Sequence, residues 1–286
     1  ATSCNEDFNE DVAAPQQWEQ EAAITLPQLT ISPVPTISYD QVIDSIAIFN
    51  PSLNGELPEG ARLDNFYVDL VAENGKKKTL NTSSTGKVAT AELQATIEEL
   101  YGKRPIDRKF NATVYANVII NGQASLIKGE TTVTAIPVAP QISQHYYLIG
   151  APSAWDPTCV TMPFNHSDKD VYEDPYFTVM FTTTADNQYW KIIPQEHVDE
   201  GNIWGNNVVG TAVDGDANLE GTLINEGAQA GKIEKAGMYK MTINMMQYTY
   251  KIEELNFNEY IYEIGGLDWS SSRPLYGQNF DGKYQG

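Results

Sequence analysis

The stretch HYYLIGAPSAWDPT (residues 145–158) decides the fold of this chain, because it returns in altered form as YIYEIGGLDWSSSRP (residues 260–274). In both copies an aromatic strand runs to a glycine turn, and a tryptophan follows a few residues later. The copies begin 115 residues apart, which is close to the length of one β-sandwich domain. We therefore expect tandem modules that open with the same strand, the second of them cut short soon after the repeat.

Upstream of the repeat, the pattern predicts an immunoglobulin-like sandwich. Short alternating runs bounded by turn residues predict strands over residues 24–32, 44–52, 64–75, 110–122 and 129–138. Asn74-Gly75 and Asn121-Gly122 are hairpin signals, because glycine supplies a positive φ. Residues 90–102 differ: their apolar side chains recur at helical spacing and a glycine ends the run, which predicts one short helix.

From His145 onward a second all-β series follows, and it closes with a hairpin near residue 252. Pro137 and Pro140 mark a hinge between the two series. The fold class is therefore all-β. We expect an acidic flexible tether at 1–22, an immunoglobulin-like domain at 23–140, a second β-sandwich at 141–256 and the truncated start of a further module at 257–286.

The charge of the chain excludes some partners. With 18 Lys and Arg against 38 Asp and Glu, the formal net charge is −20. A field of that sign repels phosphate backbones and anionic lipid headgroups, so we expect neither nucleic acid nor direct membrane binding. The net charge does not oppose the binding of neutral ligands.

The two cysteines, Cys4 and Cys159, lie in different settings. The head ATSC is followed by the acidic run NEDFNED, and a small-residue run that ends in cysteine is typical of a bacterial lipoprotein signal. We expect acyl chains on Cys4 to be the sole membrane contact. The alternative is an ordinary solvated charge run after an unrelated cysteine. Cys159 is expected to be a lone thiol.

Three tryptophans gather in the module at 141–256: Trp155, Trp190 and Trp204, with Tyr189, Lys191, Asn206 and Asn207 near them in the sequence. An aromatic face stacks on the apolar C–H face of a sugar ring, while amide and ammonium groups bond its hydroxyls. Trp155 and Trp204 lie in turn-like sequence. Tyr189 and Trp190 are neighbours in a strand, so one points inward and the other outward. For each tryptophan alone, a place in the core is the competing interpretation.

The sequence offers no signature of catalysis. The segment DGDANLEG (residues 214–221) lacks the glycine and the final glutamate of a calcium loop, so we expect no metal. The histidines have no metal-ligand spacing, and nucleophile and phosphate-loop motifs are absent from the sequence. We expect no enzyme and no cofactor. A carboxylate pair of glycosidase type stays open, as does an adhesive or structural protein that binds a protein partner.

In their order, the motifs YYLIGAPSAWD, YWKII, IWGNN and AGMYKMTINMMQYTYKI resemble the SusE/SusF-type glycan-binding lipoproteins. The cysteine with its acidic tether, the helix AELQATIEEL and the strand FNATVYANVII also fit, so the resemblance covers nearly the whole chain. It implies an immunoglobulin-like domain followed by carbohydrate-binding-module-like sandwiches.

The resemblance also implies a function. Such a protein is non-catalytic, is lipid-anchored at the outer-membrane surface, and captures a polysaccharide, most typically starch or another glucan. It passes the glycan to a TonB-dependent porin and its partner lipoprotein. Trp204 and Lys191 stand at the positions that match the family's aromatic and hydrogen-bonding sites, and Trp155 is placed less closely. The truncated module at 257–286 departs from the family pattern, so we expect no complete site around Trp269 and Arg273.

Overall fold

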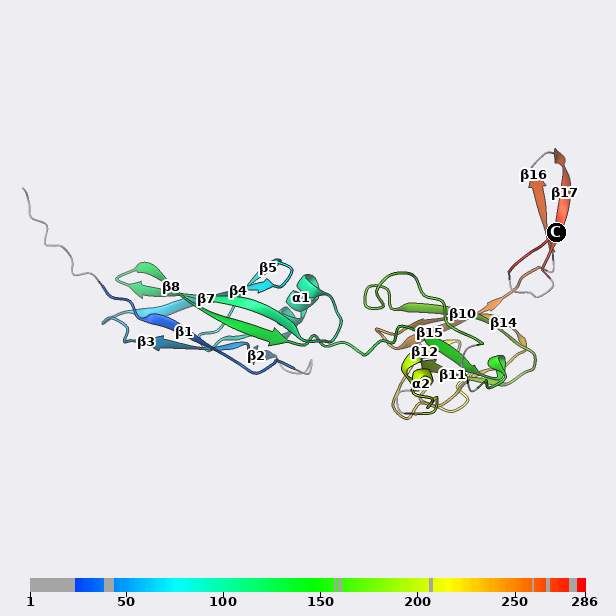
Figure 1. The fold of residues 1–286 in the computed structure, drawn as a ribbon, viewed down its shortest axis with the longest axis horizontal. Coiled ribbons are helices and arrows are strands. Elements are labelled where there is room, and N and C mark those ends of the chain that lie inside the picture. Colours follow the sequence, from blue (N-terminus) through cyan, green and yellow to red (C-terminus); the bar gives the residue numbers. More distant parts are fainter. Residues whose placement is uncertain are drawn as a thin grey trace, which may run out of the picture. The chain divides into compact units, whose positions relative to one another are not determined.

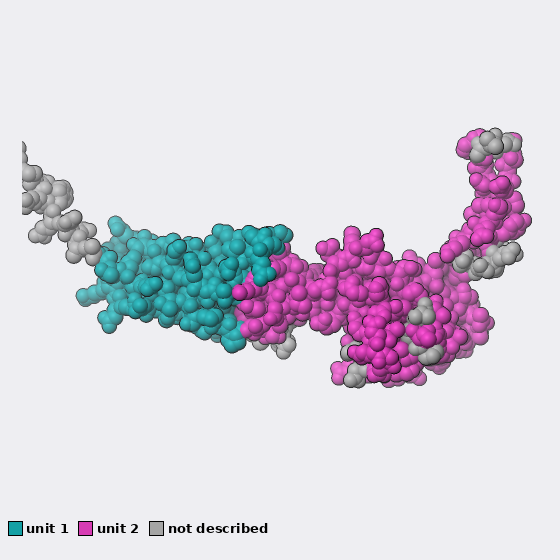
Figure 2. Space-filling view, viewed as in Figure 1, with its two compact units in different colours: residues 1–35, 45–89, 110–133 teal, residues 36–44, 90–109, 134–286 magenta. Residues whose placement is uncertain are grey.

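The computed structural model describes residues 24–38, 44–156, 158, 161–205, 208–258, 260–265, 268–277 and 282–286. Strands dominate these residues and helices are few, which confirms the all-β class. The chain forms two compact units (Figure 2): unit 1 holds residues 1–35, 45–89 and 110–133, and unit 2 holds residues 36–44, 90–109 and 134–286. The domain boundaries expected from the sequence stay a prediction.

Unit 1 is built from three small antiparallel sheets (Figure 1). The largest has the order β5-β4-β7-β8, with strands β4 (Arg62–Ala72), β5 (Lys77–Asn81), β7 (Arg108–Ile120) and β8 (Gln123–Ala135). The other two pair β1 (Gln28–Pro33) with β3 (Phe49–Asn54) and β2 (Ser45–Ala47) with β6 (Lys87–Ala89).

The core of unit 1 follows from alternation along its long strands. In β4 and β7 every second side chain is buried, among them Phe66, Val68 and Leu70 on β4 and Phe110 and Val114 on β7. A pleated strand turns alternate side chains to opposite faces, so one face of this sheet is buried and the other is partly exposed. At Asn121-Gly122 both residues have positive φ, as the hairpin signal predicted.

The predicted helix is α1 (Thr90–Tyr101), which belongs to unit 2. Its buried side chains include Leu93, Ile97 and Leu100, at the spacing of one helix face. The side chain of Gln94 also bonds both backbone groups of Val138, which donates at 2.9 Å and accepts at 3.1 Å. These two bonds hold the segment after β8 against the helix.

The rest of unit 2 contains a two-sheet sandwich. One sheet has the order β10-β14-β15-β12, with strands β10 (Tyr176–Thr183), β12 (Glu220–Thr222), β14 (Gly237–Asn244) and β15 (Thr249–Leu255). The other has the order β13-β11-β9, with strands β9 (Tyr146–Gly150), β11 (Gln188–Pro194) and β13 (Gly231–Ile233). A short helix, α2 (Gln195–Asp199), follows β11.

A cluster of aromatic and aliphatic side chains fills the space inside the sandwich, and Trp190 is its largest fully buried member. The Trp190 ring meets Tyr250 edge-on, with ring centroids 5.2 Å apart. A Cβ at Gly231 would lie 2.2 Å from the indole, so only glycine lets β13 lie against it. The Trp190 ring therefore packs directly over the backbone of its strand partner Gly231.

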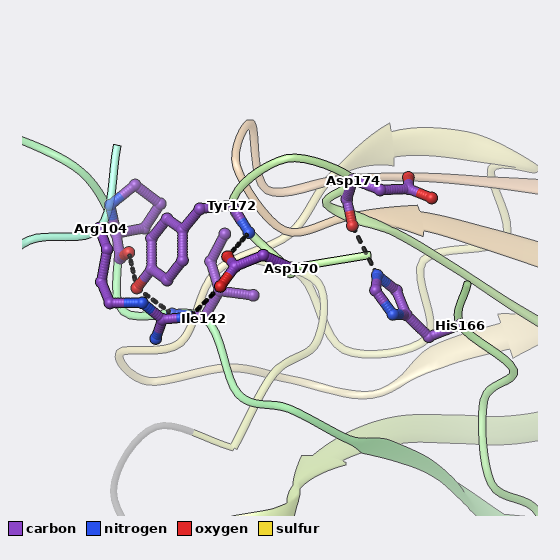
Figure 3. Close-up of polar contacts among 7 residues, drawn as sticks. Arg104, Ile142, His166, Asp170, Tyr172 and Asp174 are labelled. Carbon is purple, nitrogen blue, oxygen red and sulfur yellow. Dashed lines mark hydrogen bonds and ion pairs between the residues drawn. The ribbon is translucent and has the colours of Figure 1, made fainter. Parts of the chain in front are cut away.

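A polar cluster ties the loop after α1 to the loop before β10 (Figure 3). The Arg104 guanidinium pairs with the Asp170 carboxylate at 2.7 Å and lies over the Tyr172 ring, 4.6 Å from its centroid. The Tyr172 hydroxyl donates to the Pro140 carbonyl and accepts from the Ile142 amide, both at 3.1 Å. One tyrosine thereby fixes the backbone that leads into β9.

The second copy of the opening motif forms a hairpin of β16 (Tyr260–Gly265) and β17 (Asp268–Tyr276). The two copies differ in burial: Tyr146 and Leu148 of β9 are buried, whereas Tyr260 and Tyr262 of β16 are exposed, and Trp269 is 81% exposed. Within the described ranges, no helix is long and apolar enough to cross a membrane.

Candidate functional site

The loop after β9 presents Trp155. Gly150 ends the strand at φ +142°, and a Cβ there would lie 2.1 Å from the Tyr189 carbonyl oxygen, so the position requires glycine. A 3₁₀ turn over Ala151–Ser153 follows. Ala154 and Trp155 then both adopt the left-handed conformation, and the Trp155 amide donates to the Gly150 carbonyl at 2.8 Å. This tight reversal leaves the Trp155 side chain 46% exposed.

Strand β11 supplies the positively charged side chain, Lys191. Trp190 and Ile192 point into the core, so Tyr189 and Lys191 belong to the opposite face. Lys191 is half-buried, and its ammonium donates to the Ala228 carbonyl at 2.7 Å. An ammonium has three protons, so a lysine held by one acceptor still has donors for a ligand.

The turn after α2 presents Trp204. Two backbone bonds shape it: the Asn202 amide donates to the His197 carbonyl, and the Gly205 amide donates to the Asn202 carbonyl. The His197 ring also bonds the Asn202 carbonyl through Nδ1, at 3.0 Å. Ile203 anchors the turn in a small second core. With its neighbour anchored, Trp204 is left 54% exposed.

Lys191 and Trp204 meet in one groove of about 810 Å³. Its lining residues are Lys191, Trp204, Gly205, Val208, Asn225, Glu226, Gly227 and Ala228. The Trp155 ring lies beside that of Trp204, with centroids 6.3 Å apart and planes inclined at 39°. The groove thus joins one exposed aromatic face to an ammonium, an amide and a carboxylate, with a second exposed ring beside it; such groups bind a polyhydroxylated ring.

The structure brings together only some of the site residues that the sequence predicted. It brings Trp155, Lys191 and Trp204 together. Tyr189 is 37% exposed and lies beside Gly215, and it does not line the groove. The prediction that Trp190 binds the glycan is wrong, because its side chain is completely buried in the core and has no surface to offer a ligand. Asn206, Asn207, Cys4 and Cys159 lie outside the described residues.

Sequence reasoning missed the loop 225–228. It carries Asn225 and Glu226 into the groove and provides the carbonyl that holds Lys191. Its sequence, NEGA, has a turn signal at the glycine but no aromatic residue, so nothing in it indicates a ligand. Only the packing of this loop against β11 shows its place in the site.

The fold and the groove define a β-sandwich binding module of the carbohydrate-binding type. Two family models match the chain: "Outer membrane protein SusF, N-terminal domain" over residues 4–137, and "SusF, first starch specific CBM" over residues 141–254. The chain belongs to the SusE/SusF-type family, as its motifs predicted.

A curated sequence and a solved structure, both named SusF and from the same organism, are similar to this chain. The curated outer membrane protein SusF of Bacteroides thetaiotaomicron is 23% identical over 281 residues, which is 94% of this chain and 56% of that protein. The crystal structure of SusF from Bacteroides thetaiotaomicron has 18% sequence identity and a TM-score of 0.36, and the match covers 88% of this chain and 58% of that one. The chain therefore spans little more than half the length of these relatives.

Proposed function

We propose that this protein is a non-catalytic polysaccharide-binding lipoprotein of the bacterial outer-membrane surface, and that starch or a related glucan is its ligand. The observation that carries the proposal is the pair of exposed, inclined indole rings beside Lys191. The match of this module to a starch-specific carbohydrate-binding model supports the choice of sugar.

The inclination of the rings favours a curved glycan. An α-linked glucan coils, so successive sugar rings present faces at an angle to one another, whereas a β-1,4-linked glucan is flat. Planes inclined at 39° fit the first shape better than the second. Trp155 and Trp204 would stack on adjacent sugar units, while Lys191 and Asn225 would bond their hydroxyls.

The groove favours binding over catalysis. Glycoside hydrolysis needs two carboxyl groups that flank the bond to be cut. Among the described residues that line the groove, Glu226 is the sole carboxylate. The adhesive alternative is not favoured either, because the site is a polar hollow with two ring faces and not a broad apolar patch.

Further parts of the proposal concern residues and partners that the structure does not contain. Cys4 would carry the lipid anchor that holds the protein at the cell surface. The captured glycan would pass to a TonB-dependent porin and its partner lipoprotein. A Cys4→Ser variant that still takes up labelled fatty acid would contradict the anchor, and failure of the porin to co-purify would contradict the partnership.

Affinity electrophoresis tests the central proposal. The chain is run through gels that contain amylopectin, a β-1,4-linked glucan or no polysaccharide. We expect retardation by amylopectin only. A Trp155→Ala/Trp204→Ala double variant should migrate freely in all three gels. Equal migration of the unchanged chain with and without amylopectin would contradict starch as the ligand.

A further inference from the structure

A second cavity, of about 680 Å³, adjoins the Trp204 groove. Asn225 lines both hollows, and the consecutive residues Val208 and Val209 line one each. A Cβ at Gly205, in the groove, would lie 3.1 Å from His197 Cε1, in the cavity. The two hollows therefore share Asn225 as a common wall residue.

The second cavity presents hydrogen-bonding groups that the fold does not use. His197 is 7% exposed, and its Nδ1 bonds the Asn202 carbonyl, which can only accept, so Nδ1 carries the proton. In the neutral ring Nε2 is then an acceptor, and none of the described residues hydrogen-bonds it. The exposed carboxylate of Glu196 adds a second acceptor at the same cavity.

Tyr248 lines the second cavity and bonds Asn225, the residue that both hollows share. Its hydroxyl accepts from Asn225 Nδ2 at 3.2 Å, and no described residue accepts the hydroxyl proton in turn. Burial raises the pKa of Tyr248, so the proton stays in place at neutral pH. Asn225 Oδ1 likewise has no partner among the described residues. A chain of hydroxyl groups that crosses Asn225 would find a donor and an acceptor there.

Part of the cavity wall is apolar. Pro140, Pro194, Val209 and Leu223 line it, and the half-buried Tyr248 ring stands among them. Apolar walls with a few convergent polar groups are the composition of small-molecule sites, which commonly occupy about 300–1,000 Å³. Each hollow alone falls within that range, so the two together suit a ligand longer than either.

We infer that the cavity at Tyr248 and His197 is a second subsite for the same glycan chain that stacks on Trp204. This inference rests on the proposed function and deepens it, because it names the substrate class: linear oligosaccharides long enough to cross Asn225. Short fragments fill the Trp204 groove alone, whereas longer chains also bond Tyr248, His197 and Glu196.

Isothermal titration calorimetry of the whole chain with maltotriose and maltoheptaose tests the inference. The unchanged protein should bind maltoheptaose more tightly than maltotriose. Tyr248→Phe removes one hydroxyl and keeps the ring, and it should weaken maltoheptaose binding about threefold to tenfold, the usual effect of one hydrogen bond. Maltotriose affinity should fall less, because Tyr248 affects that sugar only through its bond to Asn225.

Two further variants sharpen the result. Glu196→Gln changes a residue that lines the second cavity only, and it should also weaken the longer sugar selectively. Tyr176→Phe is the matched control, because this exposed tyrosine lies on β10 and lines neither hollow, and neither affinity should change. Equal affinities of the unchanged protein for both sugars, or equal losses in Tyr248→Phe, would overturn the inference alone. Failure of the unchanged protein to bind either sugar would overturn the proposed function and the inference with it.

Discussion

Replacing Trp204 with alanine tests the groove most directly. A tryptophan can bury about 150–250 Å². Because the Trp204 side chain is 54% exposed, on the order of 100 Å² is available to a ligand. A sugar ring that covers somewhat more than half of this area removes about 60 Å² from water, which at about 25 cal/mol per Å² contributes roughly 1.5 kcal/mol.

The ring contact itself adds a few tenths of a kcal/mol, so we expect Trp204→Ala to cost about 1.5–2 kcal/mol of binding free energy. That is roughly a 10- to 30-fold loss of affinity. A site with a dissociation constant of about 10⁻⁴ M would then bind only in the millimolar range. In an amylopectin gel the variant should migrate nearly as fast as in a gel without polysaccharide.

Protein stability should hardly change, because the anchor of this turn is the neighbouring Ile203. We expect a decrease in the free energy of unfolding below about 1 kcal/mol, as measured by urea titration. Trp269→Ala is the matched control, since Trp269 is 81% exposed on β17 and does not line the groove. Unchanged retention of Trp204→Ala on every glycan that the parent binds would refute the assignment of Trp204 to the site.

Three further predictions concern other residues. Lys191→Met keeps the stem of the side chain but removes its donors, and we expect a threefold to tenfold loss of glucan affinity by calorimetry; an unchanged affinity would remove the ammonium from the site. Trp190→Ala should lower the free energy of unfolding by about 3–5 kcal/mol in urea, because it empties the core; a loss of binding in a fully stable variant would contradict the buried position. The Tyr172 amide and the Arg104 guanidinium lower the pKa of Asp170, so its ionised form stabilises the fold above about pH 4 and this contribution fades as the carboxylate is protonated. Asp170→Asn should therefore be less stable than the parent at neutral pH, and the difference should shrink as the pH falls below about 4; a difference that does not shrink would contradict this reasoning.

Much of the fold could be predicted from local patterns. The helix α1 was predicted at its observed place because apolar side chains at three- and four-residue spacing can share one helix face. The hairpin at Asn121-Gly122 was predicted because both positions require positive φ. Strand positions were less accurate: the run at 44–52 is two strands, β2 and β3, and β8 begins six residues before the predicted strand. Strand ends depend on pairing partners that are distant in sequence.

The candidate site was only partly predictable. Turn-like sequence around Trp155 and Trp204 indicated exposure, and both rings are exposed. Alternation in β11 required Tyr189 and Trp190 to face opposite ways without saying which faced the core. The structure decided it, because Gly231 leaves room for an indole and β13 lies against it.

The sequence by itself determined the class of this protein: an all-β chain with two tryptophans on loops, a lysine on a strand and too much negative charge for nucleic acid. Tertiary structure decided which of these residues form a site. Lys191, Trp204 and Asn225 come from three separate segments and line one groove, in which Lys191 bonds the Ala228 carbonyl; Trp155, from a fourth segment, lies beside Trp204. Such contacts depend on the free energy of packing the whole sandwich, and no local pattern encodes them.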